Sequence, residues 1–221
     1  MNYHISTGLI LQEFPKATEC PLCAIKKIVE KNIAEQFLND AVMEDDTRAK
    51  VNKLGFCAHH FDYLFKSQNK LSLALQSQTR MRTFEKIIAN AVKNPKKLAD
   101  EIEKTSSTCI ICDLIEFNMV RYYKTIAQMY LNEKEFPKML SSTKGFCLHH
   151  YAELLRYSSS SGIKAKAYLK DLSELQSKNI ERMQKELQWF CDKHDYRNRE
   201  KPLGTSADIL PRMRTKFYGD D

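Results

Sequence analysis

The chain has 221 residues, 43% of them apolar and 29% charged, which excludes a disordered chain and allows a sizeable hydrophobic core. No apolar run is long enough to span a bilayer, and the start of the chain lacks the features of a signal peptide, so we expect a cytoplasmic protein that does not enter a membrane. The formal charge of +7 is spread, with 16 basic and 13 acidic residues in 1–110 and 19 and 15 in 111–221, as on a solvated surface.

The first predicted elements are helices. Apolar residues at helical spacing predict a helix over 25–41, directly after the C-P-L-C sequence at 20–23. A short helix should follow, with Asp45 or Asp46 as its cap. Gly55 then stands where a helix would end in a left-handed residue, and the cysteine two residues later opens a new helix.

The middle of the chain continues the helical pattern. Apolar spacing predicts a helix over 70–93 and another over 94–104, with Pro95 in its first turn. A second C-x2-C sequence, C-I-I-C at 109–112, leads into a further helical stripe that reaches Tyr130.

The last third of the chain is also predicted to be helical. Pro137 lies near the start of a short helix, and Gly145 occupies the same position relative to its cysteine as the earlier glycine does. The sequence S-S-S-S-G at 158–162 breaks the pattern, and a long final helix should run from about residue 163 to 193. Since no segment alternates as a strand would, the predicted fold class is all-α.

Two copies of one pattern organise the chain. Residues 55–60 read G-F-C-A-H-H and residues 145–150 read G-F-C-L-H-H. Each follows a C-x2-C pair at nearly the same distance. Between Cys23 and Cys57 there are 33 residues, and between Cys112 and Cys147 there are 34. This repeat indicates a duplicated unit. We therefore expect a first repeat over 1–94, a second over 95–196 with the long final helix, and a basic tail over 197–221, with the repeats packed as one globular unit.

Each repeat offers three thiolates and one imidazole. A helix turns by about 100° per residue, so a histidine three positions after the cysteine shares its face, and the first histidine of each doublet does not. Joining motifs that are consecutive in the sequence predicts two metal sites. They are Cys20, Cys23, Cys57 and His60 in the first, and Cys109, Cys112, Cys147 and His150 in the second. Three thiolates and one imidazole form a closed tetrahedral shell that suits structural zinc, so two Zn²⁺ ions per chain are expected.

Other readings of these residues stay open. An iron–sulfur cluster held by the same side chains is one alternative, although neither repeat has the closely spaced three-cysteine run of common clusters. His59 and His149 are interpreted as surface residues, supports for a ligand or packing residues. Cys191 and His194 have a C-x2-H spacing but no further C-x2-C pair to join, so they are interpreted as a helix cysteine and an exposed histidine.

The pattern favours a binding protein over an enzyme. No carboxylate recurs in register beside the predicted ligands, nucleotide-binding and hydrolase motifs are missing from the sequence, and a closed shell leaves no position for an activated water. We predict a non-enzymatic, zinc-stapled helical protein that binds an unknown protein partner through its helices or tail. Nucleic-acid binding, suggested by the charge and the basic tail, is one alternative, and an iron–sulfur or thiol redox protein is another.

The sequence also resembles a bacterial domain-of-unknown-function family. The resemblance rests on "YHISTGLILQEF", "GFCAHHFDYL", "KGFCLHHYAELL" and the tail "DYRNREKPLGTSAD", and it covers nearly the whole chain. It implies a G-F-C-x-x-H pattern, which agrees with the choice of the second histidine of each doublet. It also implies that Asp195, Tyr196, Arg197 and Asn198 belong to the family pattern. It implies no activity, substrate or partner.

Overall fold

The computed structural model describes residues 5–39, 44–67, 69–89 and 94–220. These residues form α-helices and short 3₁₀ helices and contain no strand, which confirms the predicted all-α class. Contacts divide the chain into two compact units, which we call unit 1 (Met1–Lys27 with Met119–Asp221) and unit 2 (Ile28–Asn118). The repeats expected over 1–94 and 95–196 do not coincide with these two units. The two repeats therefore remain a prediction from the sequence.

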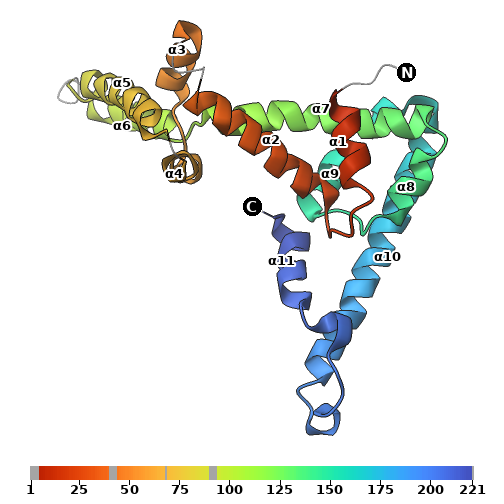
Figure 1. Ribbon diagram of the computed structural model, residues 1–221. Coiled ribbons are helices and arrows are strands. Elements are labelled where there is room, and N and C mark those ends of the chain that lie inside the picture. Colours follow the sequence, from red (N-terminus) through yellow and green to blue (C-terminus); the bar gives the residue numbers. More distant parts are fainter. Residues whose placement is uncertain (1–4, 40–43, 68, 90–93, 221) are drawn as a thin grey trace. The chain divides into compact units, whose positions relative to one another are not determined.

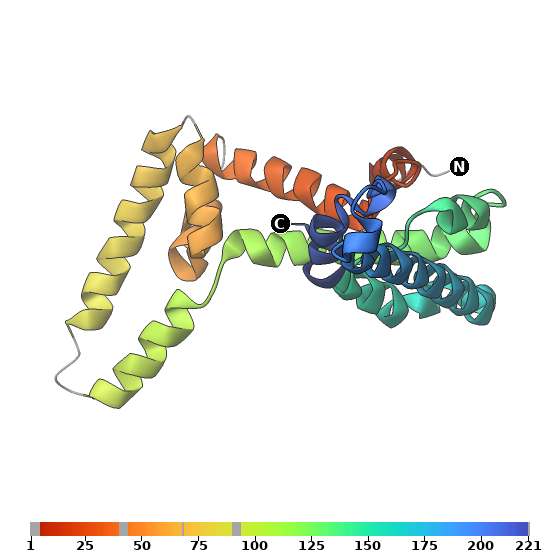
Figure 2. The ribbon, with the colours of Figure 1, turned by 90° about the horizontal axis from the view of Figure 1, so that it is seen from below.

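Unit 2 is an assembly of helices around α5. Its elements are most of α2 (Pro21–Leu38), α3 (Asp45–Leu54), α4 (Ala58–Lys66), α5 (Lys70–Ile88), α6 (Pro95–Ser106) and the start of α7 (Ile110–Asn132). Helix α5 contacts α3, α4 and α6 (Figure 2). The ring of Phe37 packs edge-on against that of Phe56, 5.8 Å away, so the phenylalanine of the first G-F-C sequence anchors its loop to α2. The ends of the helices expected over 25–41 and 70–93 fall on residues 40–41 and 90–93, outside the described residues.

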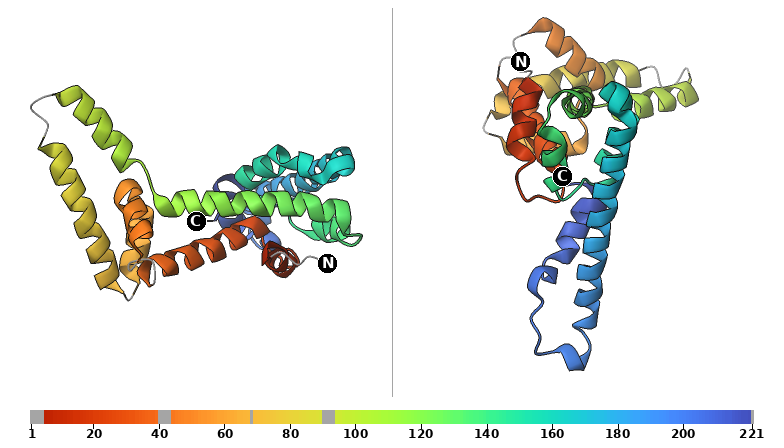
Figure 3. Two further views of the ribbon diagram at one scale, coloured as in Figure 1. Left: turned by 90° about the horizontal axis from the view of Figure 1, so that it is seen from above. Right: turned by 90° about the vertical axis from the view of Figure 1, so that its right-hand side faces the viewer.

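Unit 1 contains the longest helix, α10 (Figure 1). Its elements are α1 (Ile5–Glu13), the start of α2, the rest of α7, α8 (Phe136–Ser142), α9 (Leu148–Arg156), η2 (Ser158–Lys164), α10 (Ala165–Asp192), η3 (Tyr196–Asn198), η4 (Gly204–Ser206) and α11 (Ile209–Tyr218). Helix α11 lies beside α10, as the right-hand view of Figure 3 shows. The ring of Phe14 lies 5.7 Å from that of Phe136 and 6.0 Å from that of Phe146. The phenylalanine of the second G-F-C sequence is therefore also a core anchor.

The two predicted helix-ending glycines both have a left-handed backbone. Gly55 has φ of 67° and caps α3, with its N–H bonded to the carbonyl of Val51. Gly145 has φ of 75°, but α8 has already ended at Ser142. Each glycine therefore turns the chain into the loop that carries the next cysteine.

The start of α3 and the end of the chain differ from expectation. The N-cap of α3 is Glu44, and Asp45 and Asp46 lie in the first turn, where negative charge is favourable. The expected final helix is confirmed as α10. Residues 197–221, expected as a basic tail, contain α11, in which Ile209 and Lys216 are buried. No helix among the described residues is long and apolar enough to cross a membrane.

Candidate metal centres

Eight cysteine and histidine side chains gather in two groups of four, and the ligand atoms of each group all lie within 4.8 Å of one another. We call the groups cluster 1 and cluster 2. Cluster 1 consists of Cys20, Cys23, Cys147 and His150 in unit 1, and cluster 2 consists of Cys57, His60, Cys109 and Cys112 in unit 2. Either cluster could hold a metal ion.

The pairing of the motifs differs from the prediction. The expected sites joined each C-x2-C pair to the next G-F-C sequence along the chain. The structure joins the first C-x2-C pair to the last G-F-C sequence, and the second pair to the first G-F-C sequence. Cys20 and Cys57, expected in one site, therefore lie in different clusters. The clusters are nested in the sequence, with all of unit 2 between Cys23 and Cys147.

The length of α2 explains this correction. An α-helix rises about 1.5 Å per residue, so the 18 residues of α2 carry the chain about 27 Å away from the first C-x2-C pair. Helix α3 has 10 residues and packs against α5 and α6, so it does not bring the chain back. The first G-F-C sequence instead meets the second C-x2-C pair, which follows α6 in the sequence.

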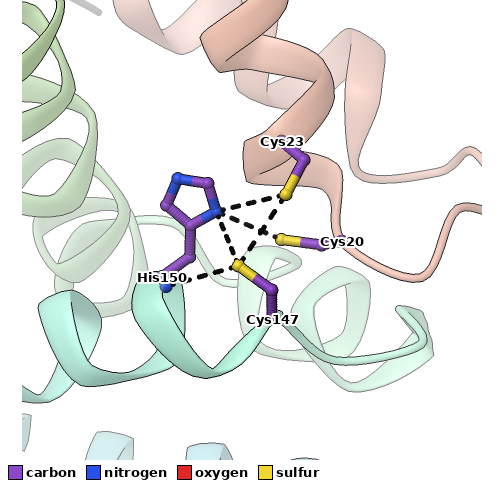
Figure 4. A group of neighbouring side chains, drawn as sticks. All are labelled: Cys20, Cys23, Cys147 and His150. Atoms are coloured by element: carbon purple, nitrogen blue, oxygen red, sulfur yellow. Dashed lines mark hydrogen bonds between the residues drawn. The ribbon is translucent and has the colours of Figure 1, made fainter. Parts of the chain in front are cut away.

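In cluster 1, three sulfur atoms face one ring nitrogen of His150 (Figure 4). The Nδ1 atom of His150 lies 3.4 Å from the Sγ of Cys20 and 3.5 Å from the Sγ of Cys23. It lies 3.1 Å from the Sγ of Cys147. The sulfurs of Cys23 and Cys147 are 3.7 Å apart.

Cluster 2 repeats this arrangement with residues from other elements. The Nδ1 atom of His60 lies 3.2 Å from the Sγ of Cys57. It lies 3.3 Å from the sulfurs of both Cys109 and Cys112. The sulfurs of Cys57 and Cys112 are 3.8 Å apart. The two clusters therefore have nearly the same shape.

These distances fit the edges of a tetrahedron around one ion. Zn–S bonds of about 2.3 Å and Zn–N bonds of about 2.0 Å place two sulfurs about 3.8 Å apart, and a sulfur and a nitrogen about 3.5 Å apart. The edges given above, four in each cluster, lie within a few tenths of an ångström of these values. The sulfurs are too far apart for disulfide bonds, and all seven cysteines are free thiols.

Four helix starts supply the ligands. Cys57 and Cys147 are the N-cap residues of α4 and α9, and the ligand histidine of each cluster lies in the first turn that follows. Each C-x2-C pair begins one residue before a helix, α2 or α7. The exposed N–H groups and the dipole at a helix start favour the thiolate form of cysteine.

In cluster 2, direct hydrogen bonds join the two ligand loops. The N–H of Ile110 donates to the carbonyl of Gly55 over 3.0 Å. The hydroxyl of Thr108 donates to the carbonyl of Leu54 over 2.6 Å. The loop before Cys109 is thus fixed to the loop before Cys57.

In cluster 1, a buried lysine from α11 joins the corresponding loops. Lys216 is 1% exposed, and its Nζ donates to the carbonyls of Glu19 and Lys144, each over 2.8 Å. These two residues are the equivalents of the pair that bond directly in cluster 2. Glu19 directly precedes the first C-x2-C pair, as Thr108 precedes the second, and Lys144 directly precedes the second G-F-C sequence, as Leu54 precedes the first. Lys216 therefore replaces a direct bond between the loops.

The carboxylate of Glu19 extends this connection to α10 and α11. It lies 2.7 Å from Arg182, 3.2 Å from Arg212 and 3.4 Å from Lys216. Burial opposes the ionisation of Glu19, but the hydrogen bond from Arg182 and the charges nearby outweigh it and lower the pKa of the carboxyl group. Beside them, the backbone N–H of Asp220 bonds to Cys23, so the end of the chain covers cluster 1.

A carboxylate lies behind the imidazole of cluster 2. The outer nitrogen of His60, Nε2, lies 3.1 Å from Oε1 of Glu30, and His59 Nε2 lies 2.9 Å from the same oxygen. The hydrogen bond with His60 is the largest cause that lowers the pKa of Glu30 to about 2. A carboxylate in this position fixes the orientation of a metal-binding histidine.

Cluster 1 has no such carboxylate. Glu30 stands seven residues after Cys23, and the residue seven positions after Cys112 is Met119. Among the described residues, the Nε2 atoms of both ligand histidines are buried without a hydrogen bond of good geometry, but that of His60 lies beside a carboxylate and that of His150 does not. The two imidazoles therefore differ in their support.

The thiols of one cluster do not ionise independently. Hydrogen bonds from Cys20 and Cys23 hold the pKa of Cys147 well below its usual range. The contact with Cys147 raises the pKa of Cys23 to about 12. In cluster 2, burial opposes the ionisation of Cys109, but hydrogen bonds with His60, Cys112 and Cys57 together outweigh it and lower the pKa of this thiol to about 6. A cation at the centre would allow all three sulfurs of a cluster to ionise together.

The clusters also differ in exposure. All four residues of cluster 1 are buried. In cluster 2, Cys109 and His60 are buried, Cys57 is half-buried and Cys112 is exposed. Solvent therefore reaches one cluster and not the other.

The remaining sequence candidates lie outside both clusters. His59 contacts Glu30, and the ring of His149 lies 5.3 Å from that of His150. Cys191 is exposed, and the ring of His194 packs against Phe190, so neither belongs to a Cys/His group among the described residues.

Two residues of the site were missed from the sequence, Glu30 and Lys216. The position of the glutamate two helical turns after a C-x2-C pair could have suggested its role. The role of the lysine could not be predicted, because a single lysine in a basic segment cannot be distinguished by sequence from the exposed lysines and arginines around it.

One family model matches the chain, over residues 1–221, and its description is a family of unknown function. No curated protein and no solved structure matches the chain significantly.

Proposed function

The chain belongs to this family, DUF6062, and because the family has no known function we propose one from the two clusters. Each cluster holds one zinc ion in a structural role, and the zinc-stapled helical protein acts by binding a partner, without catalysis. The observation that carries this proposal is the tetrahedral spacing of three sulfurs and one nitrogen, found twice.

The spacing favours a single ion over an iron–sulfur cluster. In a [4Fe–4S] cluster each ligand binds a different iron, and in a [2Fe–2S] cluster the four ligands are divided between two irons, so in both cases the set of four ligand atoms is spread apart. Here sulfurs lie 3.7 Å apart in cluster 1 and 3.8 Å apart in cluster 2, as around one tetrahedral ion. Three thiolates and an imidazole are a donor set that zinc prefers.

The closed set of four donors supports a structural role. A catalytic zinc ion keeps one position for water or substrate, and four protein donors leave none. The energetics agree, because cluster 1 closes a loop of 123 residues between Cys23 and Cys147. Closing such a loop costs roughly 4 kcal/mol, against roughly 10–16 kcal/mol gained when zinc binds to small zinc domains.

Exposed apolar side chains on unit 2 support the proposal of a protein partner. Phe65, Leu71 and Met81 are 54%, 69% and 68% exposed. A cavity of about 270 Å³ between α3, α5 and α6 is lined by Phe56 and Phe84, among others. Met81 also lines this cavity, and large exposed apolar side chains beside a pocket are typical of interaction surfaces.

Free thiols support a cytoplasmic location. All seven cysteines are unpaired, and six of them lie in the clusters. Thiolate ligands persist most readily where the surroundings are reducing.

Elemental analysis of purified protein tests the zinc proposal. We expect close to two zinc ions per chain, and the Cys20→Ser and Cys109→Ser variants should each lose one of them. Iron in place of zinc, or folded protein without metal, would contradict the proposal.

The charge distribution favours a second candidate function, nucleic-acid binding through unit 1. Unit 2 carries 13 basic and 13 acidic residues, whereas unit 1 carries 22 and 15, so the whole excess of +7 belongs to unit 1. Filter binding of labelled RNA and DNA at a series of salt concentrations tests this candidate. Retention that falls steeply with salt would support it, and no retention at low salt would eliminate it.

A further inference from the structure

The exposed edge of cluster 2 is a place where an oxidant could reach a metal-bound thiolate. Cys112 is exposed, and its contact with the half-buried Cys57 is also exposed. The other two members of the cluster, Cys109 and His60, are buried. Reactive thiolates occur where sulfur is both ionised and accessible, and a zinc ligand at the surface meets both conditions.

The two outer sulfurs are already close enough to combine. The Sγ atoms of Cys57 and Cys112 lie 3.8 Å apart, so forming a bond of about 2.05 Å requires each to move by about 1 Å. The two residues stand at the starts of different helices, α4 and α7. A disulfide between them would therefore link the two ligand loops covalently while removing two of the four donors.

We propose that cluster 2 is a redox-sensitive zinc centre, in which peroxide oxidises Cys112, a disulfide forms with Cys57 and the ion is released. This inference rests on the proposed zinc binding. Cluster 1 keeps its ion under the same conditions.

The chemistry balances with hydrogen peroxide as the oxidant. The Cys112 thiolate donates an electron pair to one peroxide oxygen, the O–O bond breaks, and hydroxide leaves, so that the sulfur becomes a sulfenic acid. The Cys57 thiolate then attacks this sulfur and displaces a second hydroxide, which forms the disulfide. Two thiolates lose two electrons in total, and one peroxide molecule is reduced. The zinc ion, left with Cys109 and His60, leaves as a hydrated cation.

Cluster 1 is protected by the end of the chain. All of its residues are buried, and a side chain added at Gly219 would lie 3.7 Å from the sulfur of Cys23 and 3.9 Å from that of Cys147. The backbone of Gly219 and Asp220 therefore covers these two sulfurs. The buried Lys216 fixes the same segment to the ligand loops. Peroxide cannot reach the cluster until α11 moves.

The test compares the two clusters within one protein. Cys191→Ser removes the exposed thiol that belongs to neither cluster, so that the remaining six cysteines are all cluster residues. The full chain is loaded with zinc, its metal content is measured, and it is treated with graded hydrogen peroxide. A zinc-sensitive dye follows the released ion. Free thiols are then alkylated, and peptide mass spectrometry locates the disulfides.

We expect one of two ions to leave at least roughly tenfold faster than the other, together with a Cys57–Cys112 disulfide and intact thiols at Cys20, Cys23 and Cys147. Reduction of the disulfide and addition of zinc should restore the ion that cluster 2 released. Simultaneous release of both ions, earlier oxidation of cluster 1, no release, or a disulfide between Cys109 and Cys112 would overturn the proposal. A chain that takes up no zinc before treatment would instead refute the proposed function.

A second variant tests whether the Cys112 sulfur itself, and not the location of cluster 2, makes the ion sensitive to peroxide. Cys112→His replaces the exposed sulfur by an imidazole and keeps four donors, so the ion should resist peroxide at least roughly tenfold longer than in the parent. Release at the parent rate would count against Cys112 as the oxidised ligand. If the variant retains no zinc at cluster 2, the disulfide mapped in the parent decides whether Cys112 is the oxidised ligand.

Discussion

The ammonium group of Lys216 lies 2.8 Å from the carbonyl oxygen of Glu19 and 3.4 Å from its carboxylate, although the two residues are almost two hundred positions apart in the sequence. Glu19 directly precedes the first ligand of cluster 1. The C-terminal helix is therefore part of the support of a metal centre whose first ligands come from the opposite end of the chain.

Lys216→Met should weaken cluster 1 selectively. The substitution keeps the buried aliphatic chain but leaves the carbonyls of Glu19 and Lys144 without their donor, so we expect the free energy of unfolding to fall by about 2 kcal/mol. One of the two zinc ions should pass to a chelator faster than in the parent. Lys185→Met is the control, because Lys185 lies on α10 with its side chain 75% exposed. Equal chelator kinetics in both variants would show that Lys216 does not support the cluster.

Glu30→Gln should weaken zinc binding at cluster 2 and leave cluster 1 unchanged. The amide keeps the size of the side chain but loses the charge that stabilises and orients His60, and such changes typically lower metal affinity by about 10–100-fold. Competition with a chelator of known affinity measures the effect. Glu35→Gln is the matched control on the same helix, since that side chain is 57% exposed. A parent-like affinity in Glu30→Gln would contradict the assigned role.

The nested pairing can be tested by thiol protection. In Cys57→Ser, the thiols of Cys109 and Cys112 should become reactive toward an alkylating reagent, while Cys20 and Cys23 stay protected by bound metal. The pairing expected from the sequence predicts the reverse. Mass spectrometry of the alkylated peptides distinguishes the two outcomes without any need for a structure of the variant.

Alkaline pH should destabilise unit 1 through Tyr130. Its hydroxyl donates to Asp171 over 2.6 Å. Burial and then this carboxylate raise the pKa of Tyr130 to about 12, from about 10 in an unfolded chain. Because the folded-state pKa is the higher one, the contribution to stability is complete below pH 10 and is lost as the pH rises through 12.

The comparison variant is Tyr130→Phe, which should be about 1 kcal/mol less stable than the parent at neutral pH and lose less stability between pH 10 and 12. Denaturant unfolding at a series of pH values measures the difference. Identical pH profiles for the two proteins would exclude Tyr130 as the titrating group.

Much of the local structure could be predicted from the sequence. The all-α class, the helices after both C-x2-C pairs and the left-handed backbone at Gly55 and Gly145 follow from residue spacing within a few turns. The choice of the second histidine in each doublet also followed from spacing, since of the two histidines only the one three positions after the helix-capping cysteine shares its face. That these residues bind zinc stays a prediction.

Interactions between distant segments could not be predicted in this way. The carboxylate of Glu30 reaches His60 from another helix, and its partner cannot be read from the sequence around it. Residues 197–221 read as a basic segment, yet α11 buries Lys216 against two ligand loops. The exposure of Cys112, in contrast to its buried equivalent Cys23, depends on which segment covers each cluster.

Spacing over a few residues was enough to predict which eight side chains could serve as ligands and which helices present them. That Cys20 and Cys23 meet the last G-F-C sequence, and not the next one along the chain, depends on packing between distant helices. This is because α2 is a continuous helix about 27 Å long, and the packing of the helices that follow it, not the order of the motifs, selects the ligands that meet.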